Sequence, residues 1–422
     1  MSEAVAELPA QASSWSGFRS AQIGWRNLWR NKRRTWLTSG GIAFAILLVM
    51  FSMAMQHGQY AAMMENATTL ISGHVQVQAT QYIDSERFEH TIDEASVLRR
   101  QLLALPDVVA IAPRVEAFAL VSSDERSFAA QILGIDVAAE AATVRLLDMI
   151  DDGRVPAGPD EAVIGEKLAR NLDVAVGGEL VILGAQKHGG VAALVVNVVG
   201  IISSGMPDLD RSLLLMPIAA VQNAFGLGDE VHTLAIRIAS LEDSAAVTKQ
   251  LASRVPADIT VRNWNEVLPG LEQAIEVDRL GGLIMYGLII ILVTFSVVNT
   301  FIMLVFERTR EFGMLLAIGM RPFGIVGLVL WEAFFVWLVG AAIGAGIAIA
   351  IILGLADVGL YMGEAMEAMA AQYYMPPRLY PAFTTEVLLV SPLILLLGTQ
   401  LAALIPALRI RRLRPVEALR SE

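Results

Sequence analysis

Few side chains in this chain are spaced for catalysis. The chain has no cysteine, which removes thiol chemistry and disulfides. Asp208, Asp210 and Arg211 could form an acid–base pair in isolation, but a polar loop is the simpler interpretation. The histidines show no spacing typical of metal ligands; they are His57, His74, His90, His188 and His232. No G-x-x-x-x-G-K-[ST] segment occurs, so no phosphate-binding loop is present. We therefore expect no catalytic residue, metal or cofactor, and an energy source on another polypeptide.

A short polar segment, residues 307–322, separates the apolar runs 280–306 and 323–353. About 20 apolar residues span a bilayer, so each run is long enough to do so. Apolar residues recur inside the polar segment at helical spacing, with charged residues elsewhere on the wheel. The pattern predicts a short amphipathic helix between two membrane helices, where a soluble partner can push on it. The candidate contact residues are Glu307, Arg308, Thr309, Arg310, Glu311, Phe312, Gly313 and Met314.

Glu332 is a carboxylate about two helical turns inside an apolar run. A charge in lipid is costly, so we expect Glu332 to face a neighbouring helix or water. Two interpretations stay open. In one, Glu332 is a contact in a transmission path or cavity; in the other, it snorkels or pairs with a basic residue. In the same run, Gly340 and Gly344 form a small-xxx-small pattern that predicts close helix packing.

Met362, Met366 and Met369 recur at helical spacing in the segment that follows. Methionine side chains adapt to irregular apolar ligands. The stripe is either a substrate-facing gate that touches acyl chains or a surface that packs on the membrane or on neighbouring helices.

Composition places the chain in a membrane. It has 422 residues, of which 55% are hydrophobic, and its mean hydropathy is +0.56, too apolar for an ordinary soluble protein. The net charge of -11 is uneven: residues 57–278 contain 31 acidic and 15 basic residues, whereas residues 1–36 and 409–422 are basic. Because Lys and Arg gather beside the cytoplasmic face, both termini are expected inside and the acidic region outside. Its acidity argues against nucleic-acid binding.

The expected fold class is an α-helical membrane protein with four transmembrane helices and an α/β extracytoplasmic domain. The expected order is a disordered N-terminus (1–16), an interfacial amphipathic helix (17–36), a first spanning helix (37–56), the extracytoplasmic domain (57–279), a second spanning helix (280–306), the polar segment (307–322), a third spanning helix (323–354), an outer loop (355–385), a fourth spanning helix (386–408) and a basic tail (409–422). The interfacial helix would be anchored by Trp25, Trp29, Arg30, Lys32, Arg33 and Arg34.

Strand–helix–strand patterns occur twice in the extracytoplasmic domain, in residues 57–117 and 221–267, which suggests a split α/β subdomain. A strand-rich insert, 118–220, lies between them, and residues 268–279 form a stalk helix. We expect the strand that begins at Val108 to be interrupted at Pro113, and residues 203–210 to form a loop.

Three stretches carry a family resemblance. They are residues 25–34 (WRNLWRNKRR), residues 307–319 (ERTREFGMLLAIG), and residues 163–169 (VIGEKLA) together with 176–178 (VGG). They resemble the MacB, FtsX and LolC/LolE group of ABC transporter permeases. Within the group, residues 200–210 (GIISSGMPDLD) look most like LolC/LolE-type sequences. The resemblance implies Porter and Sabre subdomains for the split α/β part and the insert. It also implies a MacB-like periplasmic core, mechanotransmission, and a dimer of permeases with two ABC ATPase subunits.

On this basis we expect a multi-pass inner-membrane permease that couples ATP hydrolysis on a separate subunit to extraction or release of lipoproteins or other amphiphiles. Its partners would be the ATPase, a second permease copy or a paralogue, and the lipid bilayer. A periplasmic lipoprotein carrier is a further candidate partner. No extended hook for a periplasmic carrier is recognisable in the sequence, and the hairpin at residues 186–190 looks short, which disfavours strict hand-off of a lipoprotein to a carrier. Two alternatives remain: a MacB-like exporter of periplasmic peptides or small molecules, and an FtsX-like regulator of a cell-wall hydrolase that transports nothing.

Overall fold

The computed structural model describes residues 17–82, 87–124, 126–361, 363 and 378–410. The chain divides into two compact units. The first is drawn from Met1–Gly58, Val277–Leu360 and Tyr380–Glu422, and the second from Gln59–Glu276 and Tyr361–Leu379.

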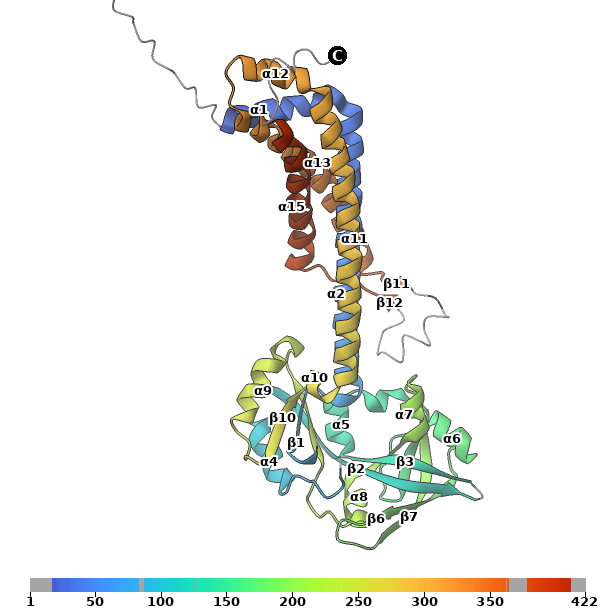
Figure 1. Ribbon diagram of the computed structural model, residues 1–422. Coiled ribbons are helices and arrows are strands. Elements are labelled where there is room, and N and C mark those ends of the chain that lie inside the picture. Colours follow the sequence, from blue (N-terminus) through green and yellow to red (C-terminus); the bar gives the residue numbers. More distant parts are fainter. Residues whose placement is uncertain (1–16, 83–86, 125, 362, 364–377, 411–422) are drawn as a thin grey trace, which may run out of the picture. The chain divides into compact units, whose positions relative to one another are not determined.

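The first unit is helical (Figure 1). Its elements are α1 (Gly17–Leu28), η1 (Trp29–Asn31), the start of α2 (Lys32–Ala67), most of α11 (Pro269–Glu307), α12 (Thr309–Ala317), α13 (Pro322–Ala356) and α15 (Thr385–Ile410). Four helices in the described part of the chain are long and apolar enough to cross a membrane; they span Ser20–Ser72, Pro269–Glu307, Pro322–Ala356 and Thr385–Ile410. This matches the predicted fold class.

Helix α13 lies against α2 at two glycines. A Cβ on Gly344 would stand 2.3 Å from the carbonyl oxygen of Ala43, and a Cβ on Gly340 would stand 2.7 Å from that of Ser39. The Ser39 hydroxyl also donates to the backbone oxygen of Val336, at 2.9 Å. Small residues let the two backbones approach this closely, as they do in packed membrane helices.

The second unit is built on one ten-stranded sheet. Its strands are β1 (Val75–Ala79), β2 (Val108–Ser123), β3 (Arg126–Ile135), β4 (Ile150–Gly153), β5 (Glu161–Gly165), β6 (Glu179–Ala185), β7 (Val191–Ile202), β8 (Leu213–Pro217), β9 (Thr233–Ile238) and β10 (Ile259–Asn263). Its other elements are η2 (Thr68–Ser72), α4 (Ala95–Leu103), α5 (Val137–Thr143), η3 (Leu146–Met149), α6 (Glu166–Leu172), α7 (Pro207–Ser212), α8 (Ile218–Phe225), η4 (Leu241–Asp243), α9 (Ser244–Ala252), α10 (Trp264–Val267) and the short strands β11 (Leu360–Tyr361) and β12 (Arg378–Leu379).

The sheet has two parts that share β2. Strands β10, β1, β9 and β2 form an open sheet on which α4 and α9 pack. Strands β2, β3, β8, β5, β7 and β6 pair in a closed ring, because β6 bonds to both β7 and β2. We call this ring the barrel. Closure removes sheet edges that would otherwise be exposed.

Two details of the sequence analysis are wrong. The break at Pro113 is absent, since β2 runs unbroken from Val108 to Ser123. Strand β3 pairs with β2 only from Arg114 onward. On the side of β3, Pro113 therefore has no paired strand, and its missing N–H costs the sheet no hydrogen bond. The loop expected at residues 203–210 contains the start of a helix, α7, with Pro207 in its first turn, where a proline is favoured.

Candidate coupling site

Helix α12 forms a corner between α11 and α13, and local sequence ends it sharply. Gly319 has φ 98°, a conformation that glycine adopts without strain. The N–H of Met320 donates to the Leu315 carbonyl, and that of Gly319 to Leu316, both at 3.0 Å. This is a Schellman-type helix end. Pro322 then occupies the first turn of α13.

The inner face of α12 is buried in the helical unit. Phe312 is fully buried, and it belongs to the same apolar core as Leu28 of α1 and Val329 of α13. The guanidinium of Arg308 stands 5.3 Å from the centre of the Phe312 ring, which is a cation–π distance.

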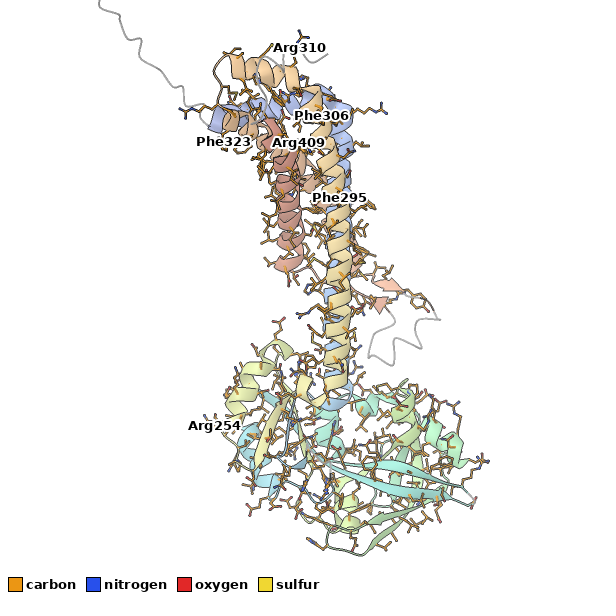
Figure 2. All side chains as sticks on the ribbon, in the orientation of Figure 1. Arg254, Phe295, Phe306, Arg310, Phe323 and Arg409 are labelled. Carbon is orange, nitrogen blue, oxygen red and sulfur yellow. The ribbon has the colours of Figure 1, made fainter. Side chains whose placement is uncertain are left out.

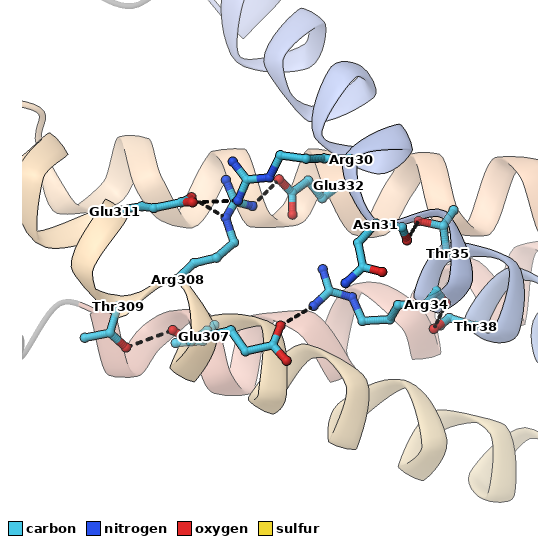
Figure 3. A network of polar contacts seen from close by, with 11 residues as sticks. Arg30, Asn31, Arg34, Thr35, Thr38, Glu307, Arg308, Thr309, Glu311 and Glu332 are labelled. Carbon is cyan, nitrogen blue, oxygen red and sulfur yellow. Dashed lines mark hydrogen bonds and ion pairs between the residues drawn. The ribbon is translucent and has the colours of Figure 1, made fainter. Parts of the chain in front are cut away.

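A network of ion pairs joins three helices at this corner (Figure 3). Arg308 donates from Nη1 to Glu332 Oε1 of α13 at 2.7 Å, and from Nε to Glu311 Oε2 of α12 at 2.8 Å. Arg30, from the N-terminal segment, donates to Glu311 Oε1 at 2.6 Å. Asn27 of α1 donates to Glu332 Oε1 at 2.6 Å. Glu332 is therefore neither alone nor exposed: its side chain is 5% accessible and that of Arg308 is 11%.

A second link lies beside the network. Arg34 of α2 donates to Glu307 Oε2 at the end of α11, at 2.9 Å. Because Glu307 is 46% exposed, this pair contributes at most about 1 kcal/mol. The buried Arg308–Glu332 pair differs, since removing one partner of a buried pair leaves an uncompensated charge.

Neighbouring charges shift the pKa values of Arg308 and Glu311. For Arg308, burial by itself would lower the pKa, but Glu332 and Glu311 outweigh it and raise the pKa above its usual value. For Glu311, burial opposes ionisation, yet Arg308 and Arg30 hold its pKa below the usual value. Both groups are therefore charged at neutral pH.

The outer face of α12 has a different character. Arg310 is exposed, as are Met314 at 48% and Ile318 at 85%. Their spacing of four places them on one side of the helix. Of the eight candidate contact residues, Arg310 and Met314 thus face outward, while Arg308, Phe312 and Gly313 face the helical unit.

The remaining candidates are the predicted membrane-interface anchors and the three methionines. Trp25 is half-exposed, and its ring meets that of Phe335 of α13 edge-on. The ring centres of Trp25 and Trp29 are 5.9 Å apart. Lys32 and Arg33 are exposed. Met362, Met366 and Met369 lie outside the described residues.

Two observations change the view of individual polar residues. Asp210 accepts from the N–H and hydroxyl of Ser204 at 2.8 and 2.6 Å, so it holds a turn; Asp208 is fully exposed at 95%.

Asn27 was not among the site residues predicted. A single amide in a basic, aromatic helix gives no periodic signal that would have identified its role.

The second unit has an apolar outer surface on the barrel. The exposed side chains are Phe118 and Leu120 of β2, Val181 and Leu183 of β6, and Val191 and Val195 of β7. Residues two apart in a strand share a face, and the pairs Leu120–Leu183 and Val181–Val195 connect the strands. We call this surface the apolar barrel face. Contiguous exposed apolar surface of this kind often marks a binding site.

The fold and the corner define a multi-pass membrane protein with a large α/β domain between its first two spanning helices. Comparison with protein families agrees. Residues 35–254 match the model of the MacB-like periplasmic core domain, and residues 283–415 match that of the FtsX-like permease C-terminal region. The chain belongs to the MacB/FtsX family of ABC transporter permeases.

Several relatives are similar over much of the chain. The lipoprotein-releasing system transmembrane protein LolC of Xylella fastidiosa is 23% identical, covering 96% of this chain and 99% of that protein. LolC of Neisseria meningitidis is 25% identical over 62% of this chain and 66% of that protein. The macrolide export ATP-binding/permease protein MacB of Acinetobacter baylyi is 24% identical, and the match covers 81% of this chain but 54% of that protein.

Several solved structures also match. The periplasmic region of MacB from Actinobacillus actinomycetemcomitans is 15% identical, with 48% of this chain and 94% of that chain covered and a TM-score of 0.36.

Proposed function

We propose that α12 receives mechanical work from a separate ABC ATPase and passes it to the helical unit. The observation that carries this proposal is the division of α12 into two faces. Its inner face is fixed to α13 and the N-terminal segment by Phe312 and the Arg308 ion pairs. Its outer face presents Arg310, Met314 and Ile318. A partner that displaces the outer face would displace α13 as well.

Charge supports a cytoplasmic position for this corner and for both termini. The described corner carries Arg26, Lys32, Arg33 and Arg310 in addition to its paired arginines, whereas residues 57–278 are strongly acidic. This is the distribution of the positive-inside rule. Helix α11 ends at Glu307 beside α12 and is unbroken back to Pro269, so it can carry motion toward the extracytoplasmic domain.

Crosslinking tests the ATPase contact directly. Because the chain has no cysteine, Met314→Cys places a single thiol on the outer face of α12. We expect it to crosslink to the co-expressed ATPase, while the matched exposed variant Ile347→Cys in the last third of α13 does not. Equal crosslinking by the two variants would contradict the assignment.

Activity gives a second readout of the same contact. The double variant Arg310→Ala/Met314→Ala should lose substrate-stimulated ATP hydrolysis in the reconstituted complex and still insert in the membrane. Both side chains are exposed, so the fold should tolerate the change. Ile347→Ala is the control, and full stimulation in the double variant would refute the coupling role.

We further propose that the substrate is a lipoprotein or another amphiphile. The full-length similarity to proteins named for lipoprotein release supports this class, and so does the apolar barrel face. In the complex, two copies of the ATPase would serve a permease dimer, formed with a second copy or a paralogue, and a periplasmic carrier could dock on the barrel.

Co-purification tests the substrate. The complex with its native ATPase should retain lipoproteins or lipids that mass spectrometry identifies. Leu120→Ser/Leu183→Ser on the apolar barrel face should lower their recovery, and Val155→Ser, an exposed valine outside the named strands, should not. Recovery of peptides or small molecules alone would favour a MacB-like exporter, and recovery of a cell-wall hydrolase would favour a regulator.

A further inference from the structure

A small groove lies between the ends of α11 and α15, separate from the ion-pair network. It encloses about 60 Å³, and its lining includes Ile302, Phe306, Thr309, Pro406 and Arg409. Figure 2 labels Phe306 and Arg409 near the same end of the helical unit. Phe306 is 66% exposed, so the groove opens on the outer surface of the helices.

Arg409 is the only charged residue among the described residues that line the groove. It is exposed in the last turn of α15, and no ion pair or hydrogen bond of its side chain is found among the described residues. A cation at a helix C-terminus is stabilised by the helix dipole. That stabilisation accounts for the position of Arg409 but not for the apolar groove beside it. The hydroxyl of Thr309 is already donated to the Val305 carbonyl at 2.9 Å, so it supplies no further donor.

We propose that this groove binds an anionic glycerophospholipid from the surrounding bilayer. The acyl chain lies along Ile302, Phe306 and Pro406, and Arg409 binds the phosphate. The occupant must be apolar over most of its length and negative at one end, since the described lining is apolar apart from Thr309 and the cation of Arg409. Basic pockets between spanning helices on the cytoplasmic side bind such headgroups.

The surroundings favour lipid over the other occupants. The adjacent outer surface is apolar, with Met303, Ile405 and Leu408 all exposed, as is expected beside hydrocarbon. A free phosphate would leave the apolar lining unused. A helix from a second copy would need to bring a carboxylate into the groove to neutralise Arg409. The lipid would also contact Thr309, the first residue of α12, and so connect bilayer composition to the corner.

Native mass spectrometry of the delipidated full-length protein tests the proposal. We expect phosphatidylglycerol to bind more tightly than phosphatidylethanolamine. Arg409→Gln should weaken phosphatidylglycerol binding about fivefold, the effect of one arginine near an anionic headgroup. It should weaken phosphatidylethanolamine binding less, because the ammonium group of that lipid offsets the charge of its phosphate. Ile302→Trp, which fills the groove, should weaken both. Arg254→Gln, an exposed arginine of the second unit labelled in Figure 2, should change neither.

Four results would overturn the proposal. Wild-type affinity in Arg409→Gln would do so, and this variant keeps the helix and hence the fold. An equal loss in Arg254→Gln would show that the effect is nonspecific. Binding of glycerol phosphate as tight as that of phosphatidylglycerol would identify a phosphate site without lipid. Loss of dimer in Ile302→Trp with lipid binding intact would identify the groove as an interface between copies.

Discussion

The Arg308–Glu332 pair is the most informative target for mutation. Glu332→Gln keeps the size of the side chain and an amide oxygen that can accept from Asn27. It removes the negative charge that stands 2.7 Å from Arg308, in a pair whose side chains are 11% and 5% exposed. Breaking a buried pair costs about 3–5 kcal/mol. Because Arg308 keeps Glu311 at 2.8 Å, we expect the lower end, about 3 kcal/mol.

The reciprocal variant and the double variant complete a thermodynamic cycle. Arg308→Gln leaves Glu332 with Asn27 as its one remaining partner in the network, so its cost should lie higher in the same range. The double variant has no unpaired buried charge. Its loss of stability should therefore be smaller than the sum of the single losses by about 2 kcal/mol, within the interaction energies measured for residues in contact.

Thermal unfolding in detergent measures this cycle, with tryptophan fluorescence as the signal. Trp29 and Trp331 belong to the same unit as the network, so their fluorescence reports on it. A control cycle uses Arg145→Gln and Asp148→Asn, an ion pair whose side chains are 68% and 64% exposed, where we expect about 0.5 kcal/mol or less. Additive losses at Arg308 and Glu332, within about 0.5 kcal/mol, would refute the reasoning that the two charges depend on each other.

Three other predictions follow from single positions. Gly344→Ala should destabilise the helical unit by about 1–3 kcal/mol, because the added Cβ would meet the Ala43 carbonyl. Gly346→Ala should be neutral in the same unfolding assay, because no atom lies within 4 Å of its added Cβ. Burial lowers the pKa of His232 from 6.5, so the folded domain resists protonation and its melting temperature should fall as pH drops below 6.5; His232→Gln should flatten this dependence, and an unchanged slope would contradict it. A membrane-impermeant maleimide should label Met314→Cys from the cytoplasmic side only, and labelling from the outside would reverse the proposed orientation.

Much of the helical unit was predictable because its signals are local. Length and hydropathy identify the spanning helices, and Gly319 followed by Pro322 marks the corner between α12 and α13. The pattern of Gly340 and Gly344 indicates a packed face, but it does not identify the partner. That the partner is α2 depends on a contact between residues about 300 positions apart.

The polar partners were less predictable, for the same reason. The sequence left Glu332 with two interpretations, a contact in a transmission path or a pair with a basic residue. The structure shows the pair, and its partner is Arg308 of the candidate contact segment. Neither hydropathy nor helical spacing relates Arg308, at the start of α12, to Glu332, which lies in the next helix, α13. In the second unit, closure of the barrel likewise depends on β6 pairing with β2, which strand patterns alone do not specify.

The chemistry of the corner suits transmission better than an apolar contact would. Replacing a buried ion pair with packed apolar side chains is often neutral or stabilising, so the Arg308 network is hard to explain by stability alone. Apolar surfaces such as that around Phe312 can slide past one another with little change in free energy, because the hydrophobic effect has no direction. Hydrogen-bonded ion pairs depend on distance and angle. Arg308 donates to α12 and α13 at once, so a displacement of α12 must either move α13 or expose a buried charge.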